Sequence, residues 1–171
     1  MKQPAEITRD DLIIASFAAL AISIHVLESS FPSPVPGIKP GLANIITLIV
    51  LFHYGWRFAA WVSLLRVVAG SLVLGTFMSP TFLLSLSGAC ASLLVMLLYA
   101  TPLRKWVGFV GISVLSSICH IMAQLIVAWW LFIPHSGLLA LAPVLLTAGI
   151  LFGLFNAIIA SSIEKRLTNY V

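Results

Sequence analysis

The sequence predicts an all-α polytopic membrane protein with six transmembrane helices. Of the 171 residues, 61% are hydrophobic and only 8% are charged. The mean hydropathy of +1.13 is far above the range of soluble domains. A helix needs roughly 20 apolar residues to cross a hydrocarbon core, so the length leaves room for about six crossings. We therefore expect a single integral membrane domain over residues 1–171.

Six apolar runs, each bounded by charged residues, proline or glycine, are the predicted helices. They cover approximately residues 11–31, 41–55, 57–76, 81–100, 106–132 and 138–163. The N-terminal segment contains acidic residues and lacks the basic region and small-residue cleavage site of a signal peptide. We therefore expect the first helix to remain in the mature protein.

The distribution of basic residues predicts that both termini lie on the cytoplasmic side of the cell membrane. With the N-terminus inside, the outer loops contain only Lys39. Seven basic residues then lie on the inner side: Lys2, Arg9, Arg57, Arg104, Lys105, Lys165 and Arg166. Because they are scattered along the chain and form no patch with interleaved aromatic residues, we do not expect nucleic acid as a partner.

The second predicted helix is too short to cross the membrane. Gly41 to Gly55 spans about 15 residues, or about 22 Å. Since Arg57 places the inner end near the cytoplasmic surface, the preceding loop, FPSPVPGIKPGLAN at 31–44, is expected to be re-entrant. Non-helical backbone at that depth needs protein or a water-filled cavity beside it. The alternatives are a thinned bilayer or an earlier helix start, and the prolines and glycine at 36–40 disfavour the second.

Polar side chains gather in the outer half of the predicted bundle. Ionisable groups are costly in hydrocarbon unless they face a cavity or a partner, so each is a functional hypothesis. At about 1.5 Å per residue, several such groups fall at a similar depth. They are His25, Glu28, Asn44, His120 and Gln124, with Arg66 near the midplane. Together with Lys39 they are predicted to converge on one outward-facing pocket that binds a small molecule.

Each of these residues also has a structural alternative. His25 and Glu28 lie three residues apart on one helix face and could form an intrahelical pair that needs no ligand. Gln124 or Asn44 could bond across helices, which is common in membrane bundles. Arg66 must meet an anion, backbone carbonyls or water, and pairing with Glu28 is its alternative to a functional role.

The start of the second helix adds an expected anion site. Pro40 and Gly41 are predicted to open this helix, so that unpaired backbone amides and the positive end of its dipole point toward the loop. Lys39 lies beside them. A lysine, free amides and Arg66 on one cavity would suit phosphate, diphosphate or carboxylate, as at the broken helices of transporters.

Small residues mark the expected packing surfaces. Gly149 and Gly153 of the last helix are predicted to pack inside the bundle. Ala15 and Ala19 form a similar pair on the first helix.

The stretch PGIKPGLANIITLIVLFHYGW, followed by LLRVVAGSLVLGTFMSPTFLLSLSGACAS, resembles the membrane family named Gx transporter or heptaprenyl diphosphate synthase component I. Its members look like the substrate-binding S components of energy-coupling factor transporters. The resemblance covers nearly the whole chain. It implies an S-component-like bundle that binds its ligand in the outer half, beneath a loop whose lysine is Lys39.

The resemblance also implies partners. In S components an alanine-xxx-alanine motif on the first helix contacts the transmembrane coupling subunit, and here that motif is Ala15 with Ala19. The expected partners are therefore an energising transmembrane subunit and an ATPase subunit, because the chain has no ATP-binding GxxxxGK[ST] motif.

The synthase name is the alternative, with the chain as a membrane-embedded accessory component of a heptaprenyl diphosphate synthase. Prenyl transfer needs paired Mg²⁺-binding aspartates. Asp10 and Asp11 are adjacent at the cytoplasmic end of the first helix and face no second acidic cluster, so we do not expect catalysis by this chain alone. Cys90 and Cys119 lack metal-ligand spacing and are expected to be buried packing residues, and no metal or cofactor is expected.

Overall fold

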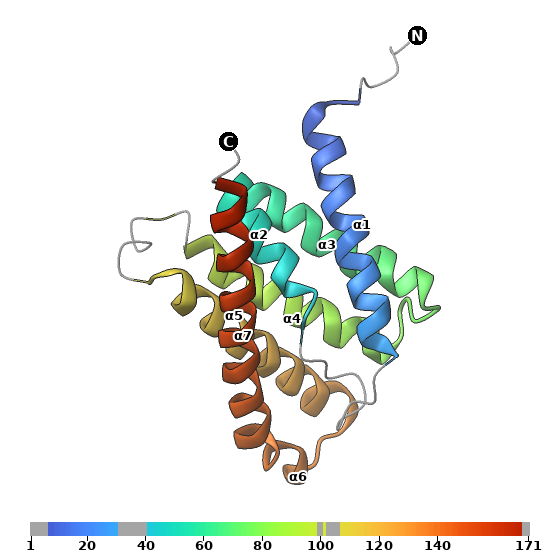
Figure 1. The fold of residues 1–171 in the computed structure, drawn as a ribbon. Coiled ribbons are helices and arrows are strands. Elements are labelled where there is room, and N and C mark those ends of the chain that lie inside the picture. The colour runs from blue at the N-terminus through green and yellow to red at the C-terminus, as the bar shows by residue number, and fades with distance from the viewer. Residues whose placement is uncertain (1–6, 31–40, 99–100, 102–106, 169–171) are drawn as a thin grey trace.

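The computed structural model describes residues 7–30, 41–98, 101 and 107–168, which are helical and contain no strand (Figure 1). Its helices are α1 Arg9–Ser29, α2 Asn44–Tyr54, α3 Trp56–Val73, α4 Pro80–Leu97, α5 Phe109–Val127, α6 Ser136–Leu139 and α7 Ala142–Thr168. A π-helical turn, η3 Ala128–Phe132, extends α5. The predicted all-α fold is confirmed.

Five helical segments are long and apolar enough to cross a membrane. They are Arg9–Ser29, Trp56–Val73, Pro80–Leu97, Phe109–Phe132 and Ser136–Ile163. Large apolar side chains remain exposed on their outer faces, including Trp130 and Leu151. Lipid is the environment in which such surfaces are stable, and the chain is a multi-pass membrane protein. The last segment is divided, because α7 restarts with Pro143 in its first turn, where a missing N–H is tolerated.

The short second helix is confirmed. α2 has 11 residues, or about 16 Å, and begins at Asn44 instead of Gly41. Seven of its residues are buried, so it lies inside the bundle. The predicted re-entrant loop, with Lys39, falls at residues 31–40, outside the described part of the chain.

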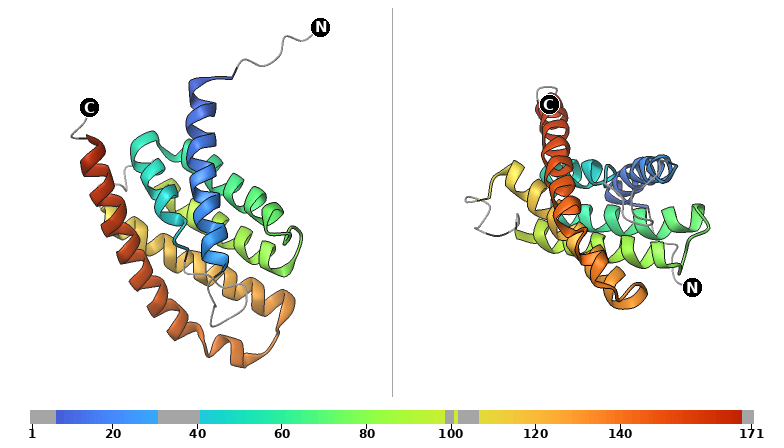
Figure 2. Two further views of the ribbon diagram at one scale, coloured as in Figure 1. Left: turned by 45° about the vertical axis from the view of Figure 1, so that its right-hand side comes forward. Right: turned by 90° about the horizontal axis from the view of Figure 1, so that it is seen from below.

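The remaining helices form a curved row around α2 (Figures 1 and 2). α1 packs on α3, α3 on α4, α4 on α5 and α5 on α7, while α2 contacts both α3 and α7. The main apolar core surrounds α2 and includes Leu48, Leu51, Val62, Met96 and Ile112. α3 and α5 therefore present side chains toward a shared interior, which positions the site described below.

Small residues set the contact between α5 and α7, as predicted. A Cβ atom added at Gly153 would lie 2.8 Å from the Cα of Val114, and one at Gly149 would lie 2.8 Å from the Cδ1 of Ile121. The Ser113 hydroxyl donates a hydrogen bond of 2.7 Å to the Gly153 carbonyl. By contrast, Cys90 is exposed on α4 and Cys119 is half-buried on α5, so the prediction that both cysteines are buried is wrong.

Candidate ligand-binding site

The structure brings six of the eight predicted pocket residues to one deep cavity. They are His25, Glu28, Gly41, Arg66, His120 and Gln124, and Val67 and Ser85 complete the wall. The contributions come from α1, the turn before α2, α3, α4 and α5. Asn44 is buried beside them and its backbone N–H donates to the Gly41 carbonyl at 2.9 Å. The eighth residue, Lys39, lies outside the described residues.

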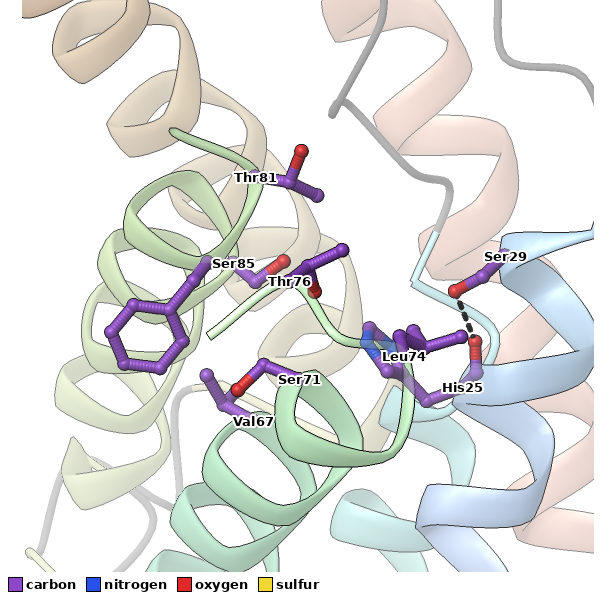
Figure 3. Close-up of a pocket in the computed structure, with 9 residues that line it drawn as sticks. His25, Ser29, Val67, Ser71, Leu74, Thr76, Thr81 and Ser85 are labelled. Atoms are coloured by element: carbon purple, nitrogen blue, oxygen red, sulfur yellow. Dashed lines mark hydrogen bonds between the residues drawn. The ribbon is translucent and has the colours of Figure 1, made fainter. Parts of the chain in front are cut away.

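A larger chamber of about 260 Å³ lies between α1, α3 and α4 (Figure 3). Most of its lining residues are polar: His25, Ser29, Ser71, Thr76, Thr81 and Ser85, with Val67, Leu74 and Phe82. The deep cavity has a volume of about 20 Å³ and shares His25, Val67 and Ser85 with this chamber, so the two adjoin. The deep cavity has room for one small polar group, and the chamber has room for the rest of a small molecule.

Each histidine of the site packs against a glycine of a neighbouring helix. A Cβ atom at Gly70 of α3 would lie 2.9 Å from the Cδ2 of His25. A Cβ atom at Gly88 of α4 would lie 2.7 Å from the Nε2 of His120. A side chain at either glycine would therefore displace the neighbouring imidazole ring. We did not predict this role, although the small-residue run around Gly88 is a signal that could have indicated it.

Glu28 accepts hydrogen bonds from the backbone amides that were predicted from the sequence to be unpaired. Its Oε1 accepts hydrogen bonds from the backbone N–H groups of Gly41, at 2.7 Å, and Leu42, at 3.1 Å. The prediction of free amides at this helix start is therefore wrong, because an internal carboxylate already fills a position that favours negative charge. Gly41 has a φ of +78°, a left-handed conformation that side chains other than glycine's rarely permit.

A second polar contact holds the same turn from the opposite side. The Nδ2 of Asn156, on α7, donates to the Gly41 carbonyl at 3.4 Å. Asn156 is fully buried. Sequence reasoning missed it, although an asparagine inside an apolar helix is a recognised sign of an interhelical bond. The turn before α2 is thus fixed to both α1 and α7.

Several polar atoms at the site have no hydrogen-bond partner among the described residues. In the deep cavity they are the Nε of Arg66, the Nδ1 of His120 and the Oε1 of Gln124. These side chains are 3%, 7% and 1% exposed. Buried polar groups are nearly always satisfied, so each of these atoms is available to bond a molecule that enters the cavity.

Arg66 and Glu28 are close enough to interact electrostatically, which agrees with the alternative considered for Arg66 above. This interaction leaves the Nε of Arg66 without an acceptor. The described residues contain no group of three or more His, Cys, Asp or Glu side chains that could hold a metal ion. Among the described residues, the site combines a buried guanidinium, a buried carboxylate, two imidazoles and an amide around a small cavity.

The sequence matches the family model described as "Heptaprenyl diphosphate synthase component I" over residues 17–163. Because this match covers most of the chain, the protein belongs to that family. No curated protein and no solved structure matches the chain.

Proposed function

We propose that this member of the heptaprenyl diphosphate synthase component I family is the substrate-binding membrane subunit of a small-molecule transporter. The carrying observation is the buried guanidinium of Arg66, whose Nε lacks an acceptor on the wall of the deep cavity. A carboxylate of the ligand would supply that acceptor with a charge-assisted bond. Lys39 is proposed to contribute from the entrance and Asn44 from the first turn of α2, whereas Gly41 contributes to the wall of the cavity.

The size and lining of the chamber support a small polar ligand. Its volume of about 260 Å³ is close to the lower end of ordinary ligand pockets. Hydroxyl groups from Ser71, Thr76, Thr81 and Ser85 offer hydrogen bonds to such a molecule. A heptaprenyl chain, which is long and apolar, would need a larger and more apolar groove.

We further propose the arrangement of the subunit in the cell. The chain forms one domain in the cytoplasmic membrane, with both termini inside and the cavity facing outward. Ala15 and Ala19 are exposed on α1, which leaves this face free for an energising transmembrane subunit that is coupled to an ATPase.

Native mass spectrometry of the gently purified protein tests ligand capture. We expect a retained small molecule on the wild-type chain and its loss from Arg66→Ala. Arg57→Ala is the matched control, because Arg57 is exposed near the start of the same helix. Equal retention by wild type and Arg66→Ala would contradict the proposed site.

The partner surface is tested separately with the double variant Ala15→Leu and Ala19→Leu. Bulky side chains on this exposed face should block co-purification of an energising subunit and leave the retained ligand unchanged. If the partner still co-purifies to the same extent, α1 is not the docking helix.

The second candidate is a membrane-embedded accessory component of a heptaprenyl diphosphate synthase, which the description of the matching family favours. Under this proposal the chain would act beside a soluble catalytic subunit. Prenyl transfer rates and product lengths, measured with that subunit alone and with this chain added, decide the matter. No change in either quantity would remove the accessory role.

A further inference from the structure

We propose that the ligand is a small zwitterion, with a cationic hydrogen-bond donor such as an ammonium group as well as the carboxylate that meets Arg66. This inference rests on the proposed function and names the ligand class of the same site. Three features of the site support it: its balance of charge, its unpartnered atoms, and the use that Glu28 makes of the backbone amides.

The balance of charge favours a ligand with no net charge. Arg66 and Glu28 are the two oppositely charged side chains among the described residues that line the deep cavity. Both are nearly buried, at 3% and 5% exposure. Beside these two side chains a zwitterion keeps the local sum of charges at zero, whereas phosphate or a simple carboxylate adds negative charge that this pair does not compensate, which is disfavoured inside a membrane.

The unpartnered atoms require that the ligand carry a hydrogen-bond donor as well as an acceptor. The Nε of Arg66 is a donor and needs an acceptor from the ligand. The Oε1 of Gln124 is an acceptor and needs a donor. Both side chains line the same cavity of about 20 Å³. A carboxylate that carries no N–H or O–H group satisfies the first atom and leaves the second unsatisfied.

Glu28 is placed to reinforce the donor requirement. Both amide bonds, from Gly41 and Leu42, end on its Oε1, and neither uses its Oε2. The carboxylate therefore fills the amide pair that would otherwise hold a phosphate, and its charge adds negative potential to the cavity that Glu28 lines. An ammonium group is attracted to that potential, and a phosphate is repelled by it.

Binding measurements on the full chain in lipid nanodiscs test the ligand class. The probes are each standard amino acid, inorganic phosphate and diphosphate. The tightest zwitterion is then compared with its two matched analogues, the amine without the carboxylate and the acid without the ammonium. We expect the zwitterion to bind at least about 100-fold more tightly than either analogue, because each analogue leaves a buried polar group unpaired.

A charge-changing variant sharpens the test. Glu28→Gln keeps an oxygen that can accept from Gly41 and Leu42 but removes the negative charge. We expect this variant to lose the preference for the zwitterion and to bind the acid analogue more tightly than the wild type does. Asp10→Asn is the matched control, because it makes the same chemical change on the exposed first turn of α1 and should leave the preference unchanged.

The outcomes separate this inference from the proposed function. If phosphate or the acid analogue binds wild type as tightly as the best zwitterion, or if no zwitterion binds, the inference is overturned. A retained ligand that is not zwitterionic but is lost from Arg66→Ala would overturn the inference and leave the proposed function standing. If wild type retains no ligand and binds none of the probes, both the inference and the proposed function are overturned.

Discussion

The two ends of α5 use polar side chains in opposite ways. Near the N-terminal end, the Ser113 hydroxyl donates a hydrogen bond of 2.7 Å to the Gly153 carbonyl of α7. The two helix backbones lie so close there that a Cβ atom at Gly153 would clash with α5. Near the C-terminal end, His120 and Gln124 are buried just as deeply but each has an atom without a partner, beside a cavity.

The difference teaches how to separate structural from functional polarity in a membrane helix. A partnered interhelical bond contributes about 0.6 kcal/mol on average. An unpartnered buried group costs about 1–3 kcal/mol. The Ser113 end therefore holds α5 against α7, whereas the Gln124 end carries the cost of its unpartnered atoms, which the proposed ligand would offset. Substitutions at the two ends should accordingly change different quantities.

The largest effect on stability is expected from placing a side chain in the tight contact between α5 and α7, near the N-terminal end of α5. Gly153→Leu would force side-chain atoms into the backbone of α5, because even a Cβ atom would lie 2.8 Å from the Cα of Val114. We expect the free energy of unfolding to fall by about 3 kcal/mol, as measured by denaturation in detergent. Gly108→Ala is the control, since nothing lies within 4 Å of a Cβ atom there. Equal stability of the two variants would refute the close contact.

The next effect belongs to the second end of the helix. Gln124→Leu removes an amide whose Oε1 has no partner among the described residues, so the protein should become more stable by about 1 kcal/mol while ligand affinity falls by about 2 kcal/mol. Stability and affinity that fall together would show that Gln124 is a structural residue. Ser116→Ala is the control, because the Ser116 hydroxyl donates within its own helix, to the Ser113 carbonyl, and takes no part in the cavity.

Helix depth was sufficient to place most of the candidate site. Five residues chosen by counting along apolar runs line one cavity, because a helix that crosses a membrane has little freedom in where its residues lie along the membrane normal. The short α2 was predictable for the same reason. Depth alone, however, does not give the partners that a residue chooses.

The missed features depend on rotation and on contacts between distant segments. The bond from Glu28 to the Gly41 amide joins residues 13 positions apart, and the bond from Asn156 joins positions 115 apart. Neither follows from periodicity within one helix. The close contacts of Gly70 with His25 and of Gly88 with His120 likewise depend on which face of α3 and α4 turns toward the histidine. That face is set by helix packing.

A smaller effect on stability is expected at the contact between Gly88 and His120. Gly88→Ala would place a Cβ atom 2.7 Å from the Nε2 of His120, so the imidazole must move. We expect a loss of stability of about 1 kcal/mol and a several-fold loss of ligand affinity. In a double-mutant cycle with His120→Ala, the stability cost of Gly88→Ala should disappear. Strictly additive stability changes would mean that the two residues are not in contact.

The smallest effect returns to the partnered end of α5. Ser113→Ala removes one bond to the Gly153 carbonyl, and that carbonyl belongs to a helical residue of α7. We expect the free energy of unfolding to fall by about 0.6 kcal/mol, with ligand affinity the same as in wild type. Calorimetric titration and denaturation on one preparation measure both quantities. A drop in affinity from Ser113→Ala would mean that the two ends of α5 are coupled, and the division between a packing end and a binding end would have to be given up.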